Sequence, residues 1–412
     1  MNAPEPNLTP GASPSPLVQK LNEADSLRNN GDPVGALAIL DRVVQAHPSN
    51  ARALNDMGIC LRLIGDPVKA AMVLRKARKL APDSAQIVAN LANCLRDQGD
   101  MNTAIKAYQK ALQLQPNFAL VHAELGAVYQ AVGKPDQAVQ CYEKALKLNP
   151  DHGQTLANLS SASLEIGDPQ RALDMANRSL LLAPKGRRAL AVKSIALHEL
   201  GQIEEASELV DLAWVRPFPF QAVEGYASVD SFNEALSEHV TRHPSLEYEP
   251  SNRSTKKGEQ TGELLNEPKG PVAQLEKMIE ESVEKFLDDL PKDRAHPYLT
   301  HRPKGFRLNI WGTRLGAQGH QYEHIHPGGW VSGVYYAQLP PDMSSSSEQH
   351  AGWIQFGGAP KGSKLERERP LRLIEPKQGT LVLFPSYYYH RTLPFESETK
   401  RISIAFDAIP ED

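Results

Sequence analysis

The hydrophobic and polar positions in the first half of the chain follow a repeat of 34 residues. A glycine recurs at this interval, an alanine follows each glycine by five residues, and in five units a proline follows it by seventeen. Segments such as residues 104–116 carry apolar side chains at the spacing of an amphipathic helix. The three registers are Gly31, Gly65, Gly99, Gly133, Gly167 and Gly201; Ala36, Ala70, Ala104, Ala138, Ala172 and Ala206; and Pro48, Pro82, Pro116, Pro150 and Pro184.

Each of these positions has a simple role in a helical hairpin. Glycine lets the chain turn between two helices, and alanine lets those helices pack closely. Proline ends the second helix before the next unit, because it has no amide hydrogen to donate. The six units therefore predict six antiparallel helical hairpins over residues 17–218.

This pattern resembles the tetratricopeptide (TPR) repeat family. The resemblance implies an all-α superhelix whose first helices line a concave surface. TPR surfaces of this kind bind extended peptides or partner proteins, so we expect a protein or peptide partner. The matching residues are Gly58, Ala70, Ala77 and Pro82 in one unit, and Gly126, Tyr129, Ala138, Tyr142, Ala145 and Pro150 in another.

A mostly polar row runs through the sixth position of the successive units. An asparagine amide offers both a donor and an acceptor to a peptide backbone, so the row is a candidate partner-binding surface. A solvated helix face is the alternative interpretation. The row consists of Asn22, Asp56, Asn90, Glu124, Asn158 and, as its one apolar member, Val192.

The repeat stops after Trp214, and a different pattern follows. Residues 219–305 are predicted to be a connecting and helical lead-in segment, with a linker-like polar stretch at 244–271 and an amphipathic helix at 271–290. From residue 306 onward, short apolar or alternating runs are separated by Gly, Pro and Ser, which predicts a β-sandwich or barrel. The expected strands lie within residues 306–312, 329–339, 352–358, 371–376, 379–385 and 401–409.

Histidines in this second half suggest a metal site. Side chains alternate along an extended chain, so His324 and His326 would share one face and Glu323 would point to the other. A third candidate, His390, follows the predicted strand at 379–385, and Arg401 comes eleven residues later. His320 and His350 stand in loop-like contexts and are interpreted as surface residues.

The order HxH, G-x-L-x-x-F-P, H and R-x-S resembles the double-stranded β-helix oxygenases that use iron(II) and 2-oxoglutarate. Within these, HxHP at residues 324–327 and SGVYY at 332–336 are similar to a subfamily found behind TPR arrays. The resemblance implies a jelly-roll oxygenase core at residues 306–412. It makes His324, His326 and His390 the iron ligands, and it assigns Arg401 and Ser403 to the distal carboxylate of 2-oxoglutarate.

One position departs from the wider oxygenase superfamily. Those enzymes have a carboxylate ligand where this chain has His326, and a neutral imidazole leaves one more unit of positive charge at the metal. Altered reactivity and inactivity are both open at this point. The alternative function is a non-catalytic TPR scaffold with a cupin-like binding module; a zinc hydrolase would leave the arginine motif unexplained.

Composition narrows the remaining possibilities. The net charge of −4, from 45 basic and 49 acidic residues, argues against nucleic acid as a partner. Residues 1–16 have no signal-peptide pattern and are predicted to be a disordered leader, and no apolar stretch is long enough for a membrane span. We therefore expect a cytoplasmic α+β multidomain enzyme, whose three cysteines, Cys60, Cys94 and Cys141, are buried hydrophobic residues.

Overall fold

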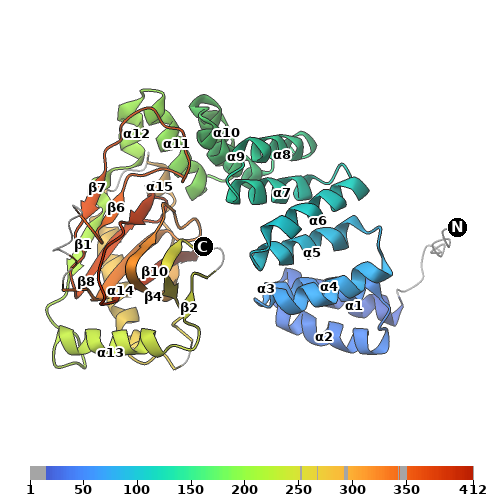
Figure 1. The fold of residues 1–412 in the computed structure, drawn as a ribbon, viewed down its shortest axis with the longest axis horizontal. Helices are drawn as coiled ribbons and strands as arrows, with labels where there is room; N and C mark the ends of the chain where they lie inside the picture. Colours follow the sequence, from blue (N-terminus) through green and yellow to red (C-terminus); the bar gives the residue numbers. More distant parts are fainter. Residues whose placement is uncertain are drawn as a thin grey trace. The chain divides into compact units, whose positions relative to one another are not determined.

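The computed structural model describes residues 15–250, 253–266, 268–291, 296–341, 343 and 350–411 (Figure 1). Most of the predicted leader, residues 1–14, lies outside the described residues. The chain forms two compact units, Met1–Val132 and Gly133–Asp412, and each is described separately. No described helix is both long and apolar enough to cross a membrane.

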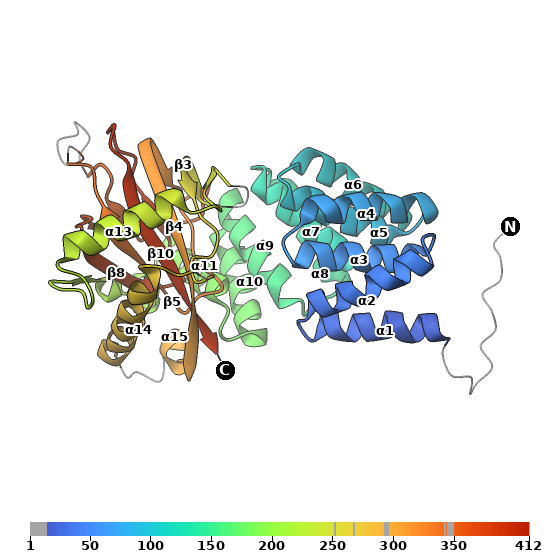
Figure 2. The same ribbon diagram turned by 90° about the horizontal axis from the view of Figure 1, so that it is seen from below.

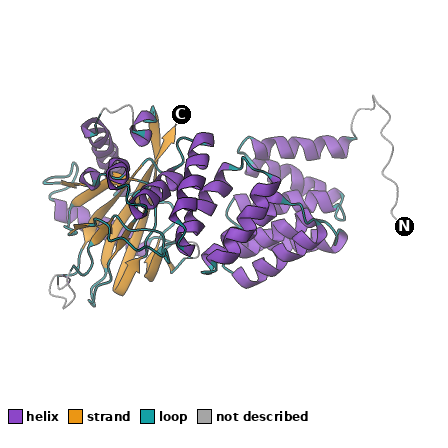
Figure 3. Cartoon of the chain, turned by 90° about the horizontal axis from the view of Figure 1, so that it is seen from above, coloured by secondary structure: helices purple, strands orange, loops and turns teal. Residues whose placement is uncertain are grey.

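The expected helical hairpins are present (Figure 3). Seven helices belong to the first unit, and the later ones belong to the second. The first unit contains α1 Pro16–Asn29, α2 Pro33–Ala46, α3 Ala51–Leu63, α4 Pro67–Leu80, α5 Ala85–Asp97, α6 Met101–Leu114 and α7 Ala119–Ala131. The second unit begins with α8 Pro135–Leu148, α9 Gly153–Ile166, α10 Pro169–Leu182, α11 Arg187–Glu199 and α12 Ile203–Leu209.

The repeat positions act as the sequence predicted. All six repeat glycines have positive φ, between 72° and 87°, at the turn inside each hairpin. Aspartate caps several of the second helices; Asp66, for example, accepts a hydrogen bond from the backbone amide of Lys69. The repeat alanines are fully buried in the first five units, so neighbouring helices approach closely.

The second unit continues into an antiparallel sheet region. After the 3₁₀ turn η1 Leu212–Trp214, the strands are β1 Arg216–Pro219, β2 Glu247–Tyr248, β3 Thr255–Gln260, β4 Gly305–Gln321, β5 Val331–Gln338, β6 Ile354–Phe356, β7 Arg372–Ile374, β8 Thr380–Pro385, β9 His390–Thr392 and β10 Arg401–Glu411. The helices among them are α13 Val229–Arg242, α14 Val272–Asp289 and α15 Pro297–Thr300.

Two antiparallel sheets result. Seven strands pair in the order β1-β8-β5-β10-β4-β3-β2, and three pair as β7-β6-β9. Helix α13 packs on β4 and β5, and α14 packs on β8, so these helices cover one face of the large sheet (Figure 2). The α+β fold class, with a TPR array before an antiparallel sheet region, is confirmed, and the two sheets fit the expected double-stranded β-helix.

Four strands were not expected: the short β9, which begins at His390, and three strands that precede β4. The segment interpreted as a linker contains β2 and β3, and β3 pairs with β4 at the edge of the large sheet. The proline-rich boundary segment forms β1, which pairs with β8. The proline-rich β1 and the two-residue β2 are the edge strands, where only one side of a strand must supply a complete ladder of hydrogen bonds, whereas β3 lies between β2 and β4.

The last repeats and the sheets share one hydrophobic core. Buried residues of α11, including Leu190 and Ile195, belong to the same cluster as Trp214 and as Tyr387 and Phe384 of the sheet region. Loop residues reinforce this packing: the amide of Lys364 donates to the carbonyl of Leu164 in α9 (3.1 Å). The final hairpins are therefore part of the structure that supports the second half of the chain.

Candidate metal centre

Three histidines from distant parts of the sequence meet at one point in the second unit. The ring centroids of His324 and His390 are 4.3 Å apart, and that of His326 lies 5.0 and 5.1 Å from them. One ligand atom from each ring falls within 4.8 Å of the others. The structure thus brings together the three residues that the sequence nominated, with the spacing that a shared metal ion requires.

Backbone hydrogen bonds fix the positions of these residues. His324 and His390 form an isolated antiparallel bridge, with N···O distances of 3.0 and 3.1 Å. The amide of His326 donates to the carbonyl of Ser386, at 2.9 Å. Backbone hydrogen bonds alone therefore hold the segment after β4 against β9 and the end of β8.

The other ring nitrogen of each histidine has an acceptor. Nδ1 of His324 lies 2.7 Å from the carbonyl oxygen of Tyr322, and Nδ1 of His390 lies 2.9 Å from that of Tyr388. Nδ1 of His326 lies 2.8 Å from Oδ1 of Asp407. Because carbonyl oxygens can only accept, Nδ1 carries the hydrogen in His324 and His390, which leaves Nε2 with a lone pair for a metal.

Burial keeps two of the imidazoles uncharged. It lowers the pKa of His324 to about 3, with a further contribution from His326, and it lowers the pKa of His390 well below its usual value. The Nε2 atoms of His326 and His390 are 3.3 Å apart. Imidazoles this close are a suitable donor set for a divalent transition metal.

Arg401 occupies the same pocket on β10 and is almost fully buried. Its Nη1 donates to the carbonyl of Gly352 (2.6 Å), and its guanidinium lies over the ring of Tyr336, 5.0 Å from the centroid. Burial lowers its pKa. Its Nε has no hydrogen-bond partner among the described residues, and no described carboxylate pairs with it. A buried cation of this kind suits an anionic ligand.

Alternation along β10 places its chemistry on one face. Arg401, Ser403 and Ala405 line the pocket with the three histidines, and Asp407 continues the same series to His326. The hydroxyl of Ser403 lies 2.8 Å from that of Thr313 on the paired strand β4. Apolar walls come from both sheets: Trp311, Val334, Ile354 and Phe384.

Other candidates from the sequence lie elsewhere. Glu323 pairs with Arg391 (2.8 Å) and is not a member of the histidine cluster. The Nδ1 atom of His320 is 3.0 Å from the carbonyl oxygen of Gln318. Sequence reasoning missed Asp407 and Trp311, whose ring stacks on His326 at 5.7 Å; the even spacing of Asp407 from Arg401 was the available signal.

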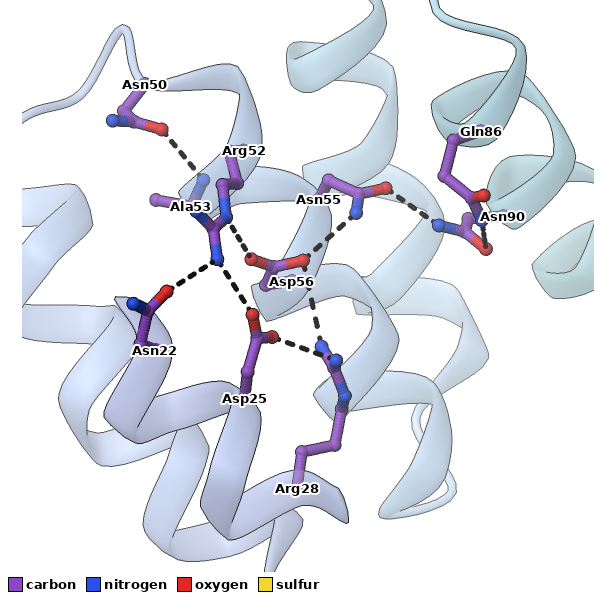
Figure 4. Close-up of polar contacts among 10 residues, drawn as sticks. All are labelled: Asn22, Asp25, Arg28, Asn50, Arg52, Ala53, Asn55, Asp56, Gln86 and Asn90. Carbon is purple, nitrogen blue, oxygen red and sulfur yellow. Dashed lines mark hydrogen bonds and ion pairs between the residues drawn. The ribbon is translucent and has the colours of Figure 1, made fainter. Parts of the chain in front are cut away.

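The polar row in the first unit is tied together by its own contacts (Figure 4). Arg52 bonds Asn22 (3.2 Å) and Asp25 (2.8 Å), while buried Asp56 accepts from Asn55 (3.1 Å). Asn90 donates to Asn55 (2.8 Å). Burial raises the pKa of Asp56. Glu124, further along the row, pairs with Arg96.

In the second unit the row has fewer contacts. The half-buried Asn158 accepts from Gln154 of the same helix (3.0 Å), and Val192 is fully buried. The row therefore ends in the shared core. Its polar members differ in the number of hydrogen bonds and ion pairs that they already make with neighbouring residues.

A family model described as "Putative 2OG-Fe(II) oxygenase" matches residues 309–407, and TPR models match residues 21–85, 92–133 and 119–152. The family models thus show TPR repeats within residues 21–152 and a domain at residues 309–407 that is similar to this family of putative oxygenases. All three histidines, Arg401 and Ser403 lie inside the oxygenase match. The oxygenase domain presents a donor set that fits a divalent metal and a buried guanidinium that fits a carboxylate, so its residues are compatible with the family's iron and 2-oxoglutarate.

Three similar solved structures, those of MamA, PilF and YrrB, each cover less than half of this chain. MamA is 28% identical over 39% of this chain and 93% of that one, with a TM-score of 0.35. PilF of Pseudomonas aeruginosa is 19% identical over 47% and 88%, with a TM-score of 0.44. YrrB, described as a TPR protein with an unusual peptide-binding site, is 20% identical over 43% and 91%, with a TM-score of 0.36. No curated protein matches the chain.

Proposed function

We propose that the second half of the chain is an iron(II)- and 2-oxoglutarate-dependent oxygenase, with hydroxylation as its expected outcome. The observation that carries this proposal is the pairing of two features in one pocket: three converging imidazoles and a buried arginine without a carboxylate partner among the described residues. A zinc site would use the histidines alone. The buried arginine supports a ligand that itself carries a negative charge, because no described carboxylate pairs with its guanidinium.

In this proposal His324, His326 and His390 hold the metal through Nε2, since acceptors occupy their Nδ1 sides. Arg401 pairs with the distal carboxylate of 2-oxoglutarate, and the Ser403 hydroxyl donates to it. Bound iron and 2-oxoglutarate would together supply oxidative decarboxylation coupled to substrate oxidation. The apolar walls at Trp311, Val334 and Phe384 limit water around these groups.

The histidine at position 326 supports the alternative function, a non-catalytic TPR scaffold with a cupin-like binding module. Three neutral imidazoles add no negative charge to a divalent metal, whereas two imidazoles and a carboxylate add one. A metal-binding module that holds 2-oxoglutarate without turnover would have the same pocket. The two functions differ in whether 2-oxoglutarate is consumed.

The deciding experiment measures succinate formation from 2-oxoglutarate with added iron(II) under air. We expect turnover by the wild-type protein and its loss in His390→Ala, with His320→Ala as a matched control because His320 lies outside the cluster. Iron affinity, measured anaerobically, should fall at least tenfold in His324→Ala and His390→Ala. Iron and 2-oxoglutarate binding without succinate would favour the binding module, and unchanged iron affinity would reject the metal site.

We further propose that the TPR array recruits a protein or peptide substrate or partner through the polar row Asn22, Asp56, Asn90, Glu124 and Asn158. Support comes from amide and carboxylate groups that recur at one position of the first five of the six helical hairpins. With a polypeptide substrate, Asn158→Ala should raise KM and leave substrate-free 2-oxoglutarate turnover unchanged. Unchanged KM would restrict the repeats to a structural role.

A further inference from the structure

Asp407 lies beside the histidine cluster and contacts one of its three rings. Its Oδ1 lies 2.8 Å from Nδ1 of His326 and accepts a hydrogen bond from the hydroxyl of Ser332, at 2.6 Å. The side chains of His326 and Asp407 are 12% and 15% exposed, so solvent screens this contact only partly. The carboxylate is therefore placed between a strand hydroxyl and an imidazole edge.

The surrounding backbone confines the carboxylate to this place. Asp407 of β10 is directly opposite Ser332 of β5 in the sheet register, which sets the hydroxyl at hydrogen-bonding distance. A Cβ atom at Gly329 would lie 3.2 Å from the Asp407 carboxyl carbon, so glycine leaves the room that this side chain occupies. The ring of Trp311 stacks on His326 and limits its rotation.

His326 differs from the other two histidines in its acceptor. Nδ1 of His324 and of His390 faces a neutral backbone carbonyl, whereas Nδ1 of His326 faces a carboxylate. A carboxylate acceptor makes the opposite nitrogen more basic and fixes which nitrogen carries the hydrogen. His326 is also the residue that replaces the carboxylate ligand expected from the wider superfamily.

We infer that Asp407 is the positioning residue of this metal centre. Its hydrogen bond orients His326 so that Nε2 faces the metal. Its negative charge lies behind His326 and acts on the metal through that ring, where a direct carboxylate ligand would bring the charge to the metal itself. The inference rests on the proposed metal site. The centre is then a three-histidine site in which a carboxylate is hydrogen-bonded to one of the three ligands.

The test compares metal binding in the full-length protein with Asp407→Asn, Asp407→Ala and Ser332→Ala. Asparagine keeps an oxygen acceptor but removes the charge, alanine removes both, and the serine variant removes only the hydrogen bond that holds the carboxylate. Glu323→Gln is the matched control, because Glu323 is a neighbouring carboxylate paired with Arg391. Affinity is measured by anaerobic iron(II) titration, and the visible spectrum of bound cobalt(II) reports the ligand field.

We expect iron affinity to fall about tenfold in Asp407→Asn and up to about a hundredfold in Asp407→Ala. The cobalt spectrum should shift in both and stay unchanged in Glu323→Gln. Thermal unfolding checks that the variants are folded. If Asp407→Ala does not fold, Ser332→Ala still tests the inference, with a smaller expected loss of iron affinity.

Wild-type affinity and an unshifted spectrum in Asp407→Asn and Ser332→Ala would overturn the inference, provided that His390→Ala still loses the metal. If His390→Ala also binds normally, the proposed metal site itself is wrong. The two failures are therefore distinguishable.

Discussion

The hydroxyl of Tyr388 donates a hydrogen bond of 2.9 Å to the backbone carbonyl of Asp211, at the end of the last helical hairpin. The backbone carbonyl of the same tyrosine accepts from Nδ1 of His390. Tyr388 thus connects the repeat array to a proposed metal ligand through two hydrogen bonds. Tyr387 makes a parallel contact, since its hydroxyl donates to the carbonyl of Leu209.

We predict that Tyr388→Phe lowers the free energy of unfolding of the second unit by about 0.5–1.5 kcal/mol, the net contribution of one hydrogen bond. The loss is limited to that bond because the Asp211 carbonyl still accepts from the backbone amide of Trp214 (3.0 Å). Urea unfolding measures the change. Tyr248→Phe is the control, because Tyr248 is 64% exposed and should show no measurable effect.

Shortened proteins should behave according to the shared core. A protein that begins at Gly133 keeps every helix that packs with the sheets, so we expect it to unfold cooperatively. A protein that begins at residue 220 loses Leu190, Ile195 and Trp214 from the same hydrophobic cluster and should aggregate or melt at lower temperature. Thermal unfolding with size-exclusion chromatography compares them; equal behaviour would contradict the shared core.

Arg401 should determine 2-oxoglutarate affinity more than iron affinity. Arg401→Lys keeps the charge but loses the planar fork, so we expect 2-oxoglutarate to bind at least tenfold more weakly, which corresponds to about 1.4 kcal/mol. Arg401→Ala should lose more. Calorimetric titration of 2-oxoglutarate provides the measurement, after iron affinity has been shown to be unchanged. Wild-type affinity for 2-oxoglutarate in both variants would exclude this role for Arg401.

The polar row should respond unequally to alanine substitution. Asn90→Ala removes the partner of buried Asn55 and should cost about 1–3 kcal/mol of stability in the first unit. Asn158→Ala removes only a contact within one exposed turn and should cost less than about 0.5 kcal/mol. Chemical denaturation separates the two. A similar loss in both would mean that the observed network does not stabilise the repeats.

The pair Glu259–Arg314 predicts a pH dependence. Two contacts of 2.6 Å join these residues across β3 and β4, and the Arg314 hydrogen bonds hold the pKa of Glu259 below its usual value. A lowered carboxyl pKa in the folded state adds stability above the unfolded pKa, and this is lost as pH falls through the folded value.

We therefore expect wild type to exceed Glu259→Gln by about 0.5–1 kcal/mol at pH 7, after allowance for partial solvent screening. The difference should disappear below the lowered pKa of Glu259, in the acid range under pH 4.5. Denaturation of both proteins between pH 7 and pH 3 measures it. A difference that grows on acidification would contradict the assignment.

The repeats and most strands were accessible from the sequence because local residue types determine them. A glycine at positive φ and a buried alanine mark each hairpin, and β5 and β8 are continuous apolar runs. Strand β3 was not accessible, because its sequence, TKKGEQ, lacks an apolar pattern and is held by pairing with β4. Long-range pairing of this kind leaves no local signal.

Side-chain alternation predicted that His324 and His326 share a face, and the resemblance to iron(II)/2-oxoglutarate oxygenases added His390. The contacts that support the cluster were not predicted. Asp407 lies 81 residues after His326, and only the sheet register brings them together. The prediction that Glu323 points away from the two histidines agrees with its pairing to Arg391. The roles of His324, His326, His390, Arg401 and Ser403 stay predictions until metal and cosubstrate binding are measured.

Strand β10 carries Arg401, Ser403 and Asp407 on a single face, with Ile402, Ile404 and Phe406 buried on the other. Because side chains alternate between the two faces of a strand, a change of length by one residue would exchange the faces of all the residues beyond it. Inserting or deleting one residue between Ser403 and Asp407 would rotate either the arginine or the aspartate to the opposite face and bring an apolar side chain into the pocket. Replacing Ile404 by valine changes only volume, so this stretch should accept altered composition far more readily than altered length.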